Sequence, residues 1–445
     1  MLAFNIEENF IVYKLVLGGI FFITFFSVNR KNLIFKYFLL FLFLFFISTL
    51  IFEENINVLK YSSFYSLLSV NSKHIEWIYF LFSIYLLSVH FTTILYKEVS
   101  YSNYCIVNCK RLKNKNFFFF IITILSVIVF NFYIDKIIAI QDEGYLSYHT
   151  GELSIKKGLY IIVGEVLFLA VLYWLLYHRS KLGILLFFVY NIFILLTGFR
   201  MPFISNILVF WILYYPLSAS KFKLIFMGFL LSPPILILSQ RYRMGNFPSS
   251  FSNASEIILN SYSELFSILN FTLDTVKAAV YLRFDTEETS SIFYGIKVLF
   301  VGLYKKITSG EYLTVSEKID YGSFAVISTN KINPHLISEG ISAGSSFLAE
   351  VFLPFGVIGV IAAGFFHVIF VNKIVFFFHK KNFLGFLILI VLAPHFLRST
   401  RSGFIDWIFI SFIYISIFYI VIVSMQSMLR LFNDSAISLN DSKNV

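Results

Sequence analysis

Charged residues are scarce in this sequence. Only 13% of its 445 residues are Asp, Glu, Lys or Arg, whereas an ordinary globular domain carries about 25%. Hydrophobic residues make up 58% of the chain and aromatic residues 20%, which is more apolar surface than a soluble core can hide. The composition therefore excludes a cytosolic enzyme, a nucleic-acid-binding protein and a disordered linker, and it indicates a polytopic membrane protein.

Cysteine and the familiar cofactor motifs are also nearly absent. The two cysteines, Cys105 and Cys109, fall in one basic loop, so we expect reduced cytoplasmic thiols and no disulfide framework. The sequence has no phosphate-binding glycine loop, no zinc spacing and no acidic metal motif. We therefore expect no metal and no cofactor. The first residues lack the positive region of a cleaved signal peptide, so we expect the first apolar run to be retained.

Long apolar runs are abundant instead. A membrane-spanning helix needs about 20 mostly apolar residues. We predict an all-α fold, in which residues 1–445 form a single transmembrane domain with about eleven spans. The predicted spans are Phe10–Val28, Leu33–Phe52, Trp77–Tyr96, Phe117–Tyr133, Leu159–Tyr177, Leu182–Leu196, Met201–Tyr215, Leu224–Ser239, Ser346–Phe370, Phe383–Leu397 and Phe404–Met425.

The basic residues of the short loops predict the orientation. Every second loop is rich in Lys and Arg, and such loops face the cytoplasm. The acidic start of the chain then lies outside, and the tail from Gln426 lies inside. The basic residues that set this orientation are Arg30, Lys31, Lys97, Lys110, Arg111, Lys113, Lys115, Arg179, Lys181, Lys221, Lys223, Lys373, Lys380 and Lys381.

The longest polar insertion, residues 240–345, lies between the eighth and ninth predicted spans and is expected to form a large outer, periplasmic loop. It is too long to be a simple connector. Within it, Ile257–Phe284 and Ser291–Lys306 carry Leu, Ile, Phe and Tyr at helical spacing. We expect these amphipathic segments to lie on the membrane surface or to cap the spanning helices. A loosely ordered loop is the alternative.

Five arginines stand at three predicted outer helix ends, where the positive-inside bias disfavours them. A guanidinium is always charged and grips phosphate oxygens with two hydrogen bonds. Helix ends that converge on one outer cavity would therefore hold a pyrophosphate. The alternative is that isolated arginines reach lipid headgroups. The five residues are Arg200, Arg241, Arg243, Arg398 and Arg401.

Two further side chains are candidates for proton transfer. His335 lies near the end of the predicted outer loop, and a histidine titrates near neutral pH. Glu350 lies early in the ninth predicted span, where an ionisable group is a functional candidate by default. The alternatives are a solvated loop residue for His335 and an arginine partner for Glu350. The titratable residues that rank lower are Glu165, Asp406 and His395, and we expect packed or hydrogen-bonded roles for His90 and His367.

These features together resemble the Wzy-type polymerases of O-antigen or capsule repeat units. The resemblance rests on the Thr-Gly-Phe-Arg turn that ends at Arg200, the Arg-x-Arg from Arg241 to Arg243, and the large outer loop. It also rests on the stretch from Gly340 to Gly359, where small residues precede Phe-Leu-Ala-Glu and then Pro-Phe-Gly-Val-Ile-Gly. Related ligases and polymerases often place a catalytic His before Asn, whereas Leu follows His335 here.

The resemblance implies an inverting, metal-independent glycosyltransferase of the GT-C type in the bacterial inner membrane. Two glycans linked to undecaprenyl pyrophosphate, a donor and an acceptor, would meet at the periplasmic face, and undecaprenyl pyrophosphate would leave. Arginines would stabilise the leaving group, and His335 or Glu350 would take the hydroxyl proton. The implied partners are these two lipid-linked glycans, membrane lipid and a chain-length regulator, with no nucleic acid.

Three alternatives remain open at this point. An O-antigen ligase shares the architecture and differs in its acceptor, the lipid A core. A lipid-linked-oligosaccharide flippase would show charges along a central cavity, whereas the arginines here stand at one face. A transporter would more often show broken spans in matching positions of two halves, and Pro202, Pro233 and Pro234 have no such counterparts.

Overall fold

A computed structural model shows an arrangement of long helices, and no strand occurs among the residues it describes. Those residues are 6–28, 32–52, 68, 70–96, 115–143, 159–198, 200–214, 273–285, 297, 300–302, 304–305, 315–321, 324–335, 346–379, 383–400 and 405–441. Within these ranges, the all-α prediction is confirmed.

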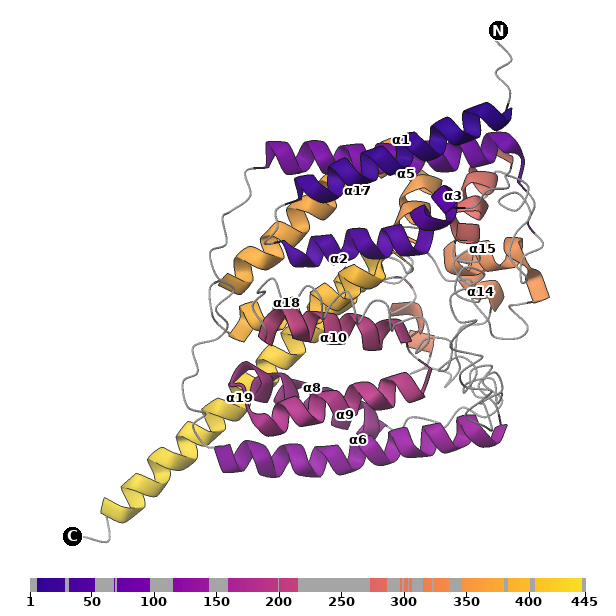
Figure 1. Ribbon diagram of the computed structural model, residues 1–445. Coiled ribbons are helices and arrows are strands. Elements are labelled where there is room, and N and C mark those ends of the chain that lie inside the picture. The colour runs from indigo at the N-terminus through magenta and orange to yellow at the C-terminus, as the bar shows by residue number, and fades with distance from the viewer. Residues whose placement is uncertain are drawn as a thin grey trace, which may run out of the picture.

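The apolar runs of the sequence form the long helices (Figure 1). The second predicted span contains a π-helical turn, η1, between α2 and α3. A further helix covers residues 273–285. The named elements are α1 Ile6–Ser27, α2 Leu33–Leu42, η1 Phe43–Ile47, α3 Ser48–Phe52, α5 Ser72–Leu95, α6 Lys115–Glu143, α8 Leu159–Tyr177, α9 Lys181–Leu196, α10 Arg200–Tyr214, α14 Val315–Asp320, α15 Phe324–Ile332, α17 Phe347–His379, α18 Phe383–Arg398 and α19 Ile405–Asp441.

Six of the described helices are long and apolar enough to cross a membrane. Four shorter apolar helices, in α8, α9, α10 and α18, coincide with further predicted spans. The eighth predicted span, Leu224–Ser239, lies outside the described residues. The chain is therefore a polytopic membrane protein, and the count of eleven spans stays a prediction. The six long candidates are Phe10–Ser27, Ile34–Ile51, Ser72–Leu95, Asn116–Asp142, Phe347–Ile374 and Ser411–Leu429.

The helices pack in two groups that α18 joins. In one group α5 packs against α1 and α17; in the other α8 packs against α6, α9 and α19. Helix α18 contacts α17 of the first group, α8 and α19 of the second, and also α2 and α10. Nearly all of its residues are buried, so α18 forms the centre of the bundle (Figure 1).

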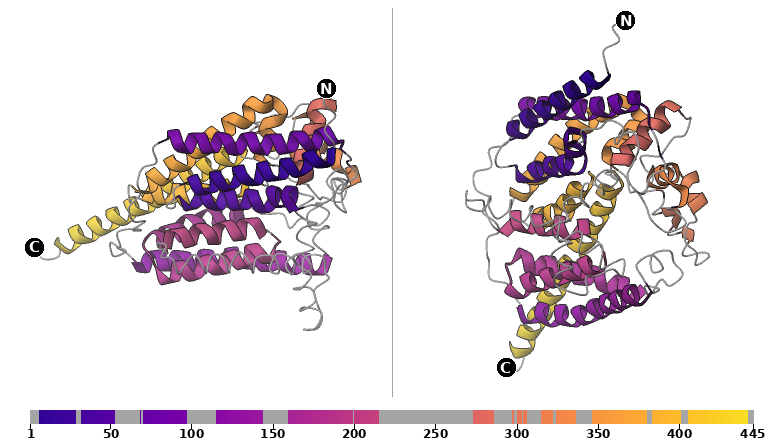
Figure 2. Two further views of the ribbon diagram at one scale, coloured as in Figure 1. Left: turned by 45° about the horizontal axis from the view of Figure 1, so that its top comes forward. Right: turned by 45° about the vertical axis from the view of Figure 1, so that its right-hand side comes forward.

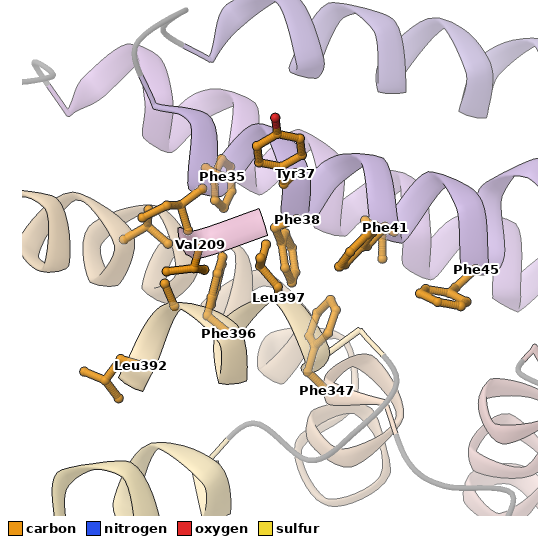
Figure 3. Close-up of a cluster of buried hydrophobic side chains, with 14 of the residues drawn as sticks. Phe35, Tyr37, Phe38, Phe41, Phe45, Val209, Phe347, Leu392, Phe396 and Leu397 are labelled. Carbon is orange, nitrogen blue, oxygen red and sulfur yellow. The ribbon is translucent and has the colours of Figure 1, made fainter. Parts of the chain in front are cut away.

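Aromatic side chains fill the space between α2, α17 and α18. The rings of Phe38 and Phe396 stack with centroids 4.5 Å apart, and Phe347 packs 5.6 Å from Phe38 (Figure 3). His367 of α17 lies fully buried beside these rings and is hydrogen-bonded to the hydroxyl of Tyr85 at 2.7 Å. The prediction that His367 is packed or hydrogen-bonded is therefore confirmed, and both are observed.

The short helices α14 and α15 gather at one side of the bundle (Figure 1). The C-terminal end of α19 extends beyond the other helices on a different side, as Figures 1 and 2 show. The opposite locations of the 240–345 loop and the C-terminal tail stay a prediction, as does the side of the membrane on which each lies.

One part of the loop fits the second of the two alternatives expected for it, in which the segment covers the spanning helices. The loop helix 273–285 is buried at every position from 273 to 280, so this part does not lie on a membrane surface. It packs inside the protein, and its last turn reaches the N-terminal end of α5. The remainder of Ile257–Phe284, and much of Ser291–Lys306, lies outside the described residues.

Candidate functional site

The first turn of α17 is attached to the turn that follows α18. The backbone N–H of Phe347 donates to the carbonyl of Ser399 at 3.1 Å. Ser346 begins the helix, because its hydroxyl accepts from the N–H of Ala349 at 3.2 Å and so satisfies a donor of the first turn. Ser346 and Ser399 are both fully buried at this junction. It joins two segments that carry predicted site residues, Glu350 and Arg398.

Arg398 is the last residue of α18, and its side chain folds back along that helix. Its Nε donates to the carbonyl of Pro394 at 3.3 Å, and its Nη2 lies 2.5 Å from Nδ1 of His395. The arginine is the donor in the second contact, so His395 accepts through Nδ1. The structure therefore pairs Arg398 with a histidine, and it turns the guanidinium toward the protein.

Glu350 occupies the first turn of α17 and is partly buried. Its backbone N–H donates to the carbonyl of Ser346 at 3.0 Å. The positive end of the helix dipole favours a carboxylate at this position. Glu350 therefore lies one turn beyond the contact between Phe347 and Ser399, near the end of α18.

Helix α17 breaks one turn after Glu350. Pro354 has no N–H to donate, and Gly356 has φ +61° and ψ −147°, outside the helical region. The guanidinium of Arg283, in the helix 273–285, donates from Nη1 to the carbonyl of Leu353 at 2.7 Å and more weakly to that of Pro354 at 3.4 Å. Arg283 thus satisfies carbonyls that the break releases from the helical pattern.

The end of the 273–285 helix is fastened to α5. His74 accepts the N–H of Asn71 on Nδ1 at 3.3 Å in a capping box, and its Nε2 lies 3.3 Å from Oδ2 of Asp285. Because Nδ1 accepts, the proton of a neutral ring is on Nε2 and is donated to Asp285. Trp77 and Phe284 pack beside this contact with ring centroids 4.9 Å apart.

The same helix carries a buried ion pair. Lys277 donates to Oδ1 of Asp274 at 2.7 Å, with side chains 1% and 0% exposed. Two charges this deep are stable in the folded protein only when each is paired or hydrogen-bonded. The contact therefore gives each of the two buried charges a counterion within the same helix.

His335 lies apart from this interior arrangement. Its side chain is exposed, and its backbone N–H donates to the amide oxygen of Asn333 at 3.1 Å. Asn333 thus caps a further helical segment that begins at Pro334.

The remaining predicted arginines are described only in part. Gly198, with φ +90°, ends α9 by donating its N–H to the carbonyl of Leu195 at 2.9 Å, and α10 begins at Arg200. Helix α10 packs against α18, the helix that carries Arg398. The side chain of Arg200, and Arg241, Arg243 and Arg401, lie outside the described residues. Their convergence on one cavity stays a prediction.

Two acidic residues within spans, Glu165 and Asp406, are candidates of lower rank. Glu165 of α8 accepts hydrogen bonds on Oε1 from the hydroxyls of Tyr133 at 2.8 Å and Tyr190 at 3.2 Å. These bonds link α6, α8 and α9 within the bundle. The side chain of Asp406 lies outside the described residues. Among the residues that are described, no three His, Cys, Asp or Glu side chains gather as a metal-binding group.

Sequence reasoning missed Arg283 because it looked for arginines at the ends of spans. The sequence does carry one signal for the break that Arg283 binds, since Pro354 and Gly356 interrupt an otherwise apolar run. Nothing in the sequence connects that break to a residue 71 positions earlier. The buried pair of Asp274 and Lys277 was missed for a similar reason, because i,i+3 charges are usually exposed.

Comparison with known proteins places the chain in one family. A sequence model of the family described as O-antigen polysaccharide polymerase Wzy matches residues 1–431. Neither a curated protein nor a solved structure matches the chain.

Proposed function

Because this chain belongs to the O-antigen polysaccharide polymerase Wzy family, we propose that it joins lipid-linked repeat units at the outer face of the bacterial inner membrane, with undecaprenyl pyrophosphate as the leaving group. The family acts as a glycosyltransferase-type polymerase on lipid-linked O-antigen repeat units. The observation that carries the proposal is the family match over nearly the whole chain, together with a polytopic helical fold.

The proposed reaction is a single displacement with inversion. A hydroxyl oxygen of the acceptor glycan forms a bond to the anomeric carbon of the donor glycan. The bond from that carbon to the pyrophosphate oxygen breaks, and undecaprenyl pyrophosphate leaves with the electron pair. The hydroxyl proton passes to a base, for which Glu350 and His335 are the candidates.

The arginines supply electrostatic stabilisation in this proposal. The leaving pyrophosphate gains negative charge in the transition state, so guanidinium groups placed beforehand lower the barrier. Arg398 supports this role, because His395 and the carbonyl of Pro394 hold its guanidinium in place. Arg200, Arg241, Arg243 and Arg401 are proposed to complete the site.

Deletion of the gene followed by glycan profiling tests the proposal. A strain without a polymerase keeps one repeat unit on the lipid A core. Loss of the glycan from the core would indicate a ligase instead, and repeat units that stall on the inner leaflet would indicate a flippase.

The proposed sidedness has its own test. Reporter fusions at Asn108 and at Ser290 are expected to lie on opposite sides of the membrane, cytoplasmic and periplasmic respectively. Reporters on the same side would contradict the periplasmic site. A chain-length regulator is a further proposed partner, and crosslinking in the membrane would detect it.

A further inference from the structure

The break in α17 holds a guanidinium in a defined orientation. Arg283 uses only Nη1 to bond the carbonyls of Leu353 and Pro354. A guanidinium carries five N–H donors in a planar fork. Among the residues that the structure describes, Nε and Nη2 of Arg283 make no hydrogen bond, and the side chain is exposed. The Nε–Nη2 edge, which matches two oxygens of one phosphate, is therefore accessible.

Glycine at position 356 keeps the backbone close to this edge. A Cβ added at Gly356 would lie 3.5 Å from Nη2 of Arg283, and the φ of +61° favours glycine in any case. The nearest acid along the helix, Asp285, is engaged by His74 of α5 at 3.3 Å. Arg283 thus presents a positive charge that no described acidic side chain pairs.

Exposed apolar side chains occur next to Arg283 in the sequence, at the break in α17 and on α5. Phe80 is 43% exposed, Phe284 47%, Phe355 52% and Ile358 78%. These residues belong to, or flank, helices that are candidate membrane spans. Leu353 is six residues into the candidate span that begins at Phe347, which is ~9 Å along the helix axis at 1.5 Å per residue. A charge at such a place is a functional candidate by default, and an anionic ligand would complement the donors that the two carbonyls do not use.

We infer that Arg283 binds the pyrophosphate of a polyprenyl-linked substrate, at a site on the lipid-facing surface of the α17 break. The inference rests on the proposed function, because polymerisation needs two such lipids bound together. The polyprenyl chain lies along Phe355 and Ile358, and the pyrophosphate meets the Nε–Nη2 edge. Glu350 precedes Leu353 by one turn of α17, so the sugar of this lipid is held close to a candidate base.

Lipid binding by the purified full-length protein tests this site. Native mass spectrometry measures binding of two probes, undecaprenyl pyrophosphate and phosphatidylglycerol. Arg283→Gln is expected to weaken undecaprenyl pyrophosphate binding about 10- to 100-fold, the usual range for a lost hydrogen bond to a charged group. Arg283→Lys keeps the charge without the fork and is expected to bind with intermediate affinity. Phosphatidylglycerol binding is expected to stay unchanged.

The control is Arg179→Gln, which removes the same charge from an exposed position in the turn between α8 and α9. Binding that matches the wild type in Arg283→Gln would overturn the inference. An equal loss for both lipids would also overturn it, because the site would then recognise any anionic headgroup. A lower melting temperature in Arg283→Gln with unchanged lipid binding would assign Arg283 to helix capping alone and overturn the inference as well.

The measurement separates this inference from the proposed function. Suppose that Arg283→Gln loses selective binding of undecaprenyl pyrophosphate, and that a strain lacking the gene still makes polymer. This combination would support the lipid site and reject the polymerase function. A deletion strain with one repeat unit, combined with unchanged binding in Arg283→Gln, would support the polymerase and reject the lipid site.

Discussion

Lys277 donates a hydrogen bond to Asp274 at 2.7 Å, one helical turn earlier, and both side chains are almost completely buried. Removal of one partner from a buried ion pair usually destabilises a protein by about 3–5 kcal/mol, because a charge stays buried without its counterion. Lys277→Met is therefore expected to lower the melting temperature of the purified protein strongly. The double variant Asp274→Leu with Lys277→Met is expected to recover a large part of the loss.

The matched control for this prediction is Lys305→Met. Lys305 bonds both carboxylate oxygens of Glu317 at 2.9 Å, but their side chains are 21% and 33% exposed. Solvent-exposed pairs contribute about 0–1 kcal/mol. A Lys277→Met protein that melts at the same temperature as Lys305→Met would contradict the stabilising role of the buried pair.

The sequence predicts the helices well because an apolar run of this length in a membrane must satisfy its own backbone hydrogen bonds, and a helix does so within one segment. It predicts their ends less well. The fourth predicted span stops at Tyr133, yet α6 continues through Asp135 and Lys136 to Glu143. Hydropathy reports how much of a helix lies in hydrocarbon, whereas backbone hydrogen bonding decides where the helix ends. The same difference explains why α19 extends beyond Met425 to Asp441.

The candidate site is predictable only where local signals exist. Glu350 stands out because ionisable groups within a span are rare, and Arg398 because the positive-inside bias disfavours an arginine at a predicted outer end. The junction of Phe347 with Ser399 brings their helices together. The bond from Arg283 to Leu353 joins residues 70 positions apart. No periodicity encodes such a contact, because it depends on how the 273–285 helix packs against α17.

Helix α17 passes very close to α5 at Gly364. A Cβ at this position would overlap the hydroxyl of Ser88 and lie 3.1 Å from the carbonyl of Tyr85. Gly364→Ala is therefore expected to force the two helices apart, at a cost of about 1–3 kcal/mol typical of overpacking. Thermal unfolding in detergent measures the change.

Gly19→Ala is the control for this substitution, since a Cβ there meets nothing within 4 Å. It is expected to be neutral or to stabilise α1 slightly, by up to about 1 kcal/mol of helix propensity. Ser88→Gly added to Gly364→Ala is expected to restore part of the lost stability. Equal melting temperatures for the two glycine variants would show that the helices separate without cost.

Arg398 is expected to be essential for polymer formation. Arg398→Gln removes the charge that the proposed mechanism places near the leaving pyrophosphate, and loss of one such group typically lowers a rate by about 10²–10³-fold. Arg398→Lys is expected to rescue poorly, because an ammonium cannot bond His395 and a phosphate with the same planar fork. Polymer length on gels, with immunoblots of membranes to verify protein level, measures the effect.

Arg179→Gln serves again as the charge-matched control and is expected to leave polymer length unchanged. His395→Ala tests whether the histidine positions the guanidinium. It is expected to reduce polymer while Arg398 retains its charge. Normal polymer in Arg398→Gln would remove this arginine from the mechanism.

The last prediction concerns the base, for which the structure gives the two candidates different surroundings. Glu350 is partly buried in the first turn of α17, between the Ser399 junction and the break that Arg283 binds, whereas His335 is exposed after α15. General-base assistance is typically worth about 10²–10⁴-fold in rate. Glu350→Gln preserves size and hydrogen bonding, so a loss of polymer of that order would identify a chemical role for the carboxylate.

His335→Ala is expected to slow polymerisation by a similar factor if the imidazole takes the proton, with donor binding nearly intact. Normal-length polymer in His335→Ala, together with none in Glu350→Gln, would assign the proton to Glu350. The reverse result would assign it to His335. If both variants make normal polymer, neither residue is the base, and the acceptor hydroxyl must lose its proton to the departing pyrophosphate or to water, with the arginines as the source of catalysis.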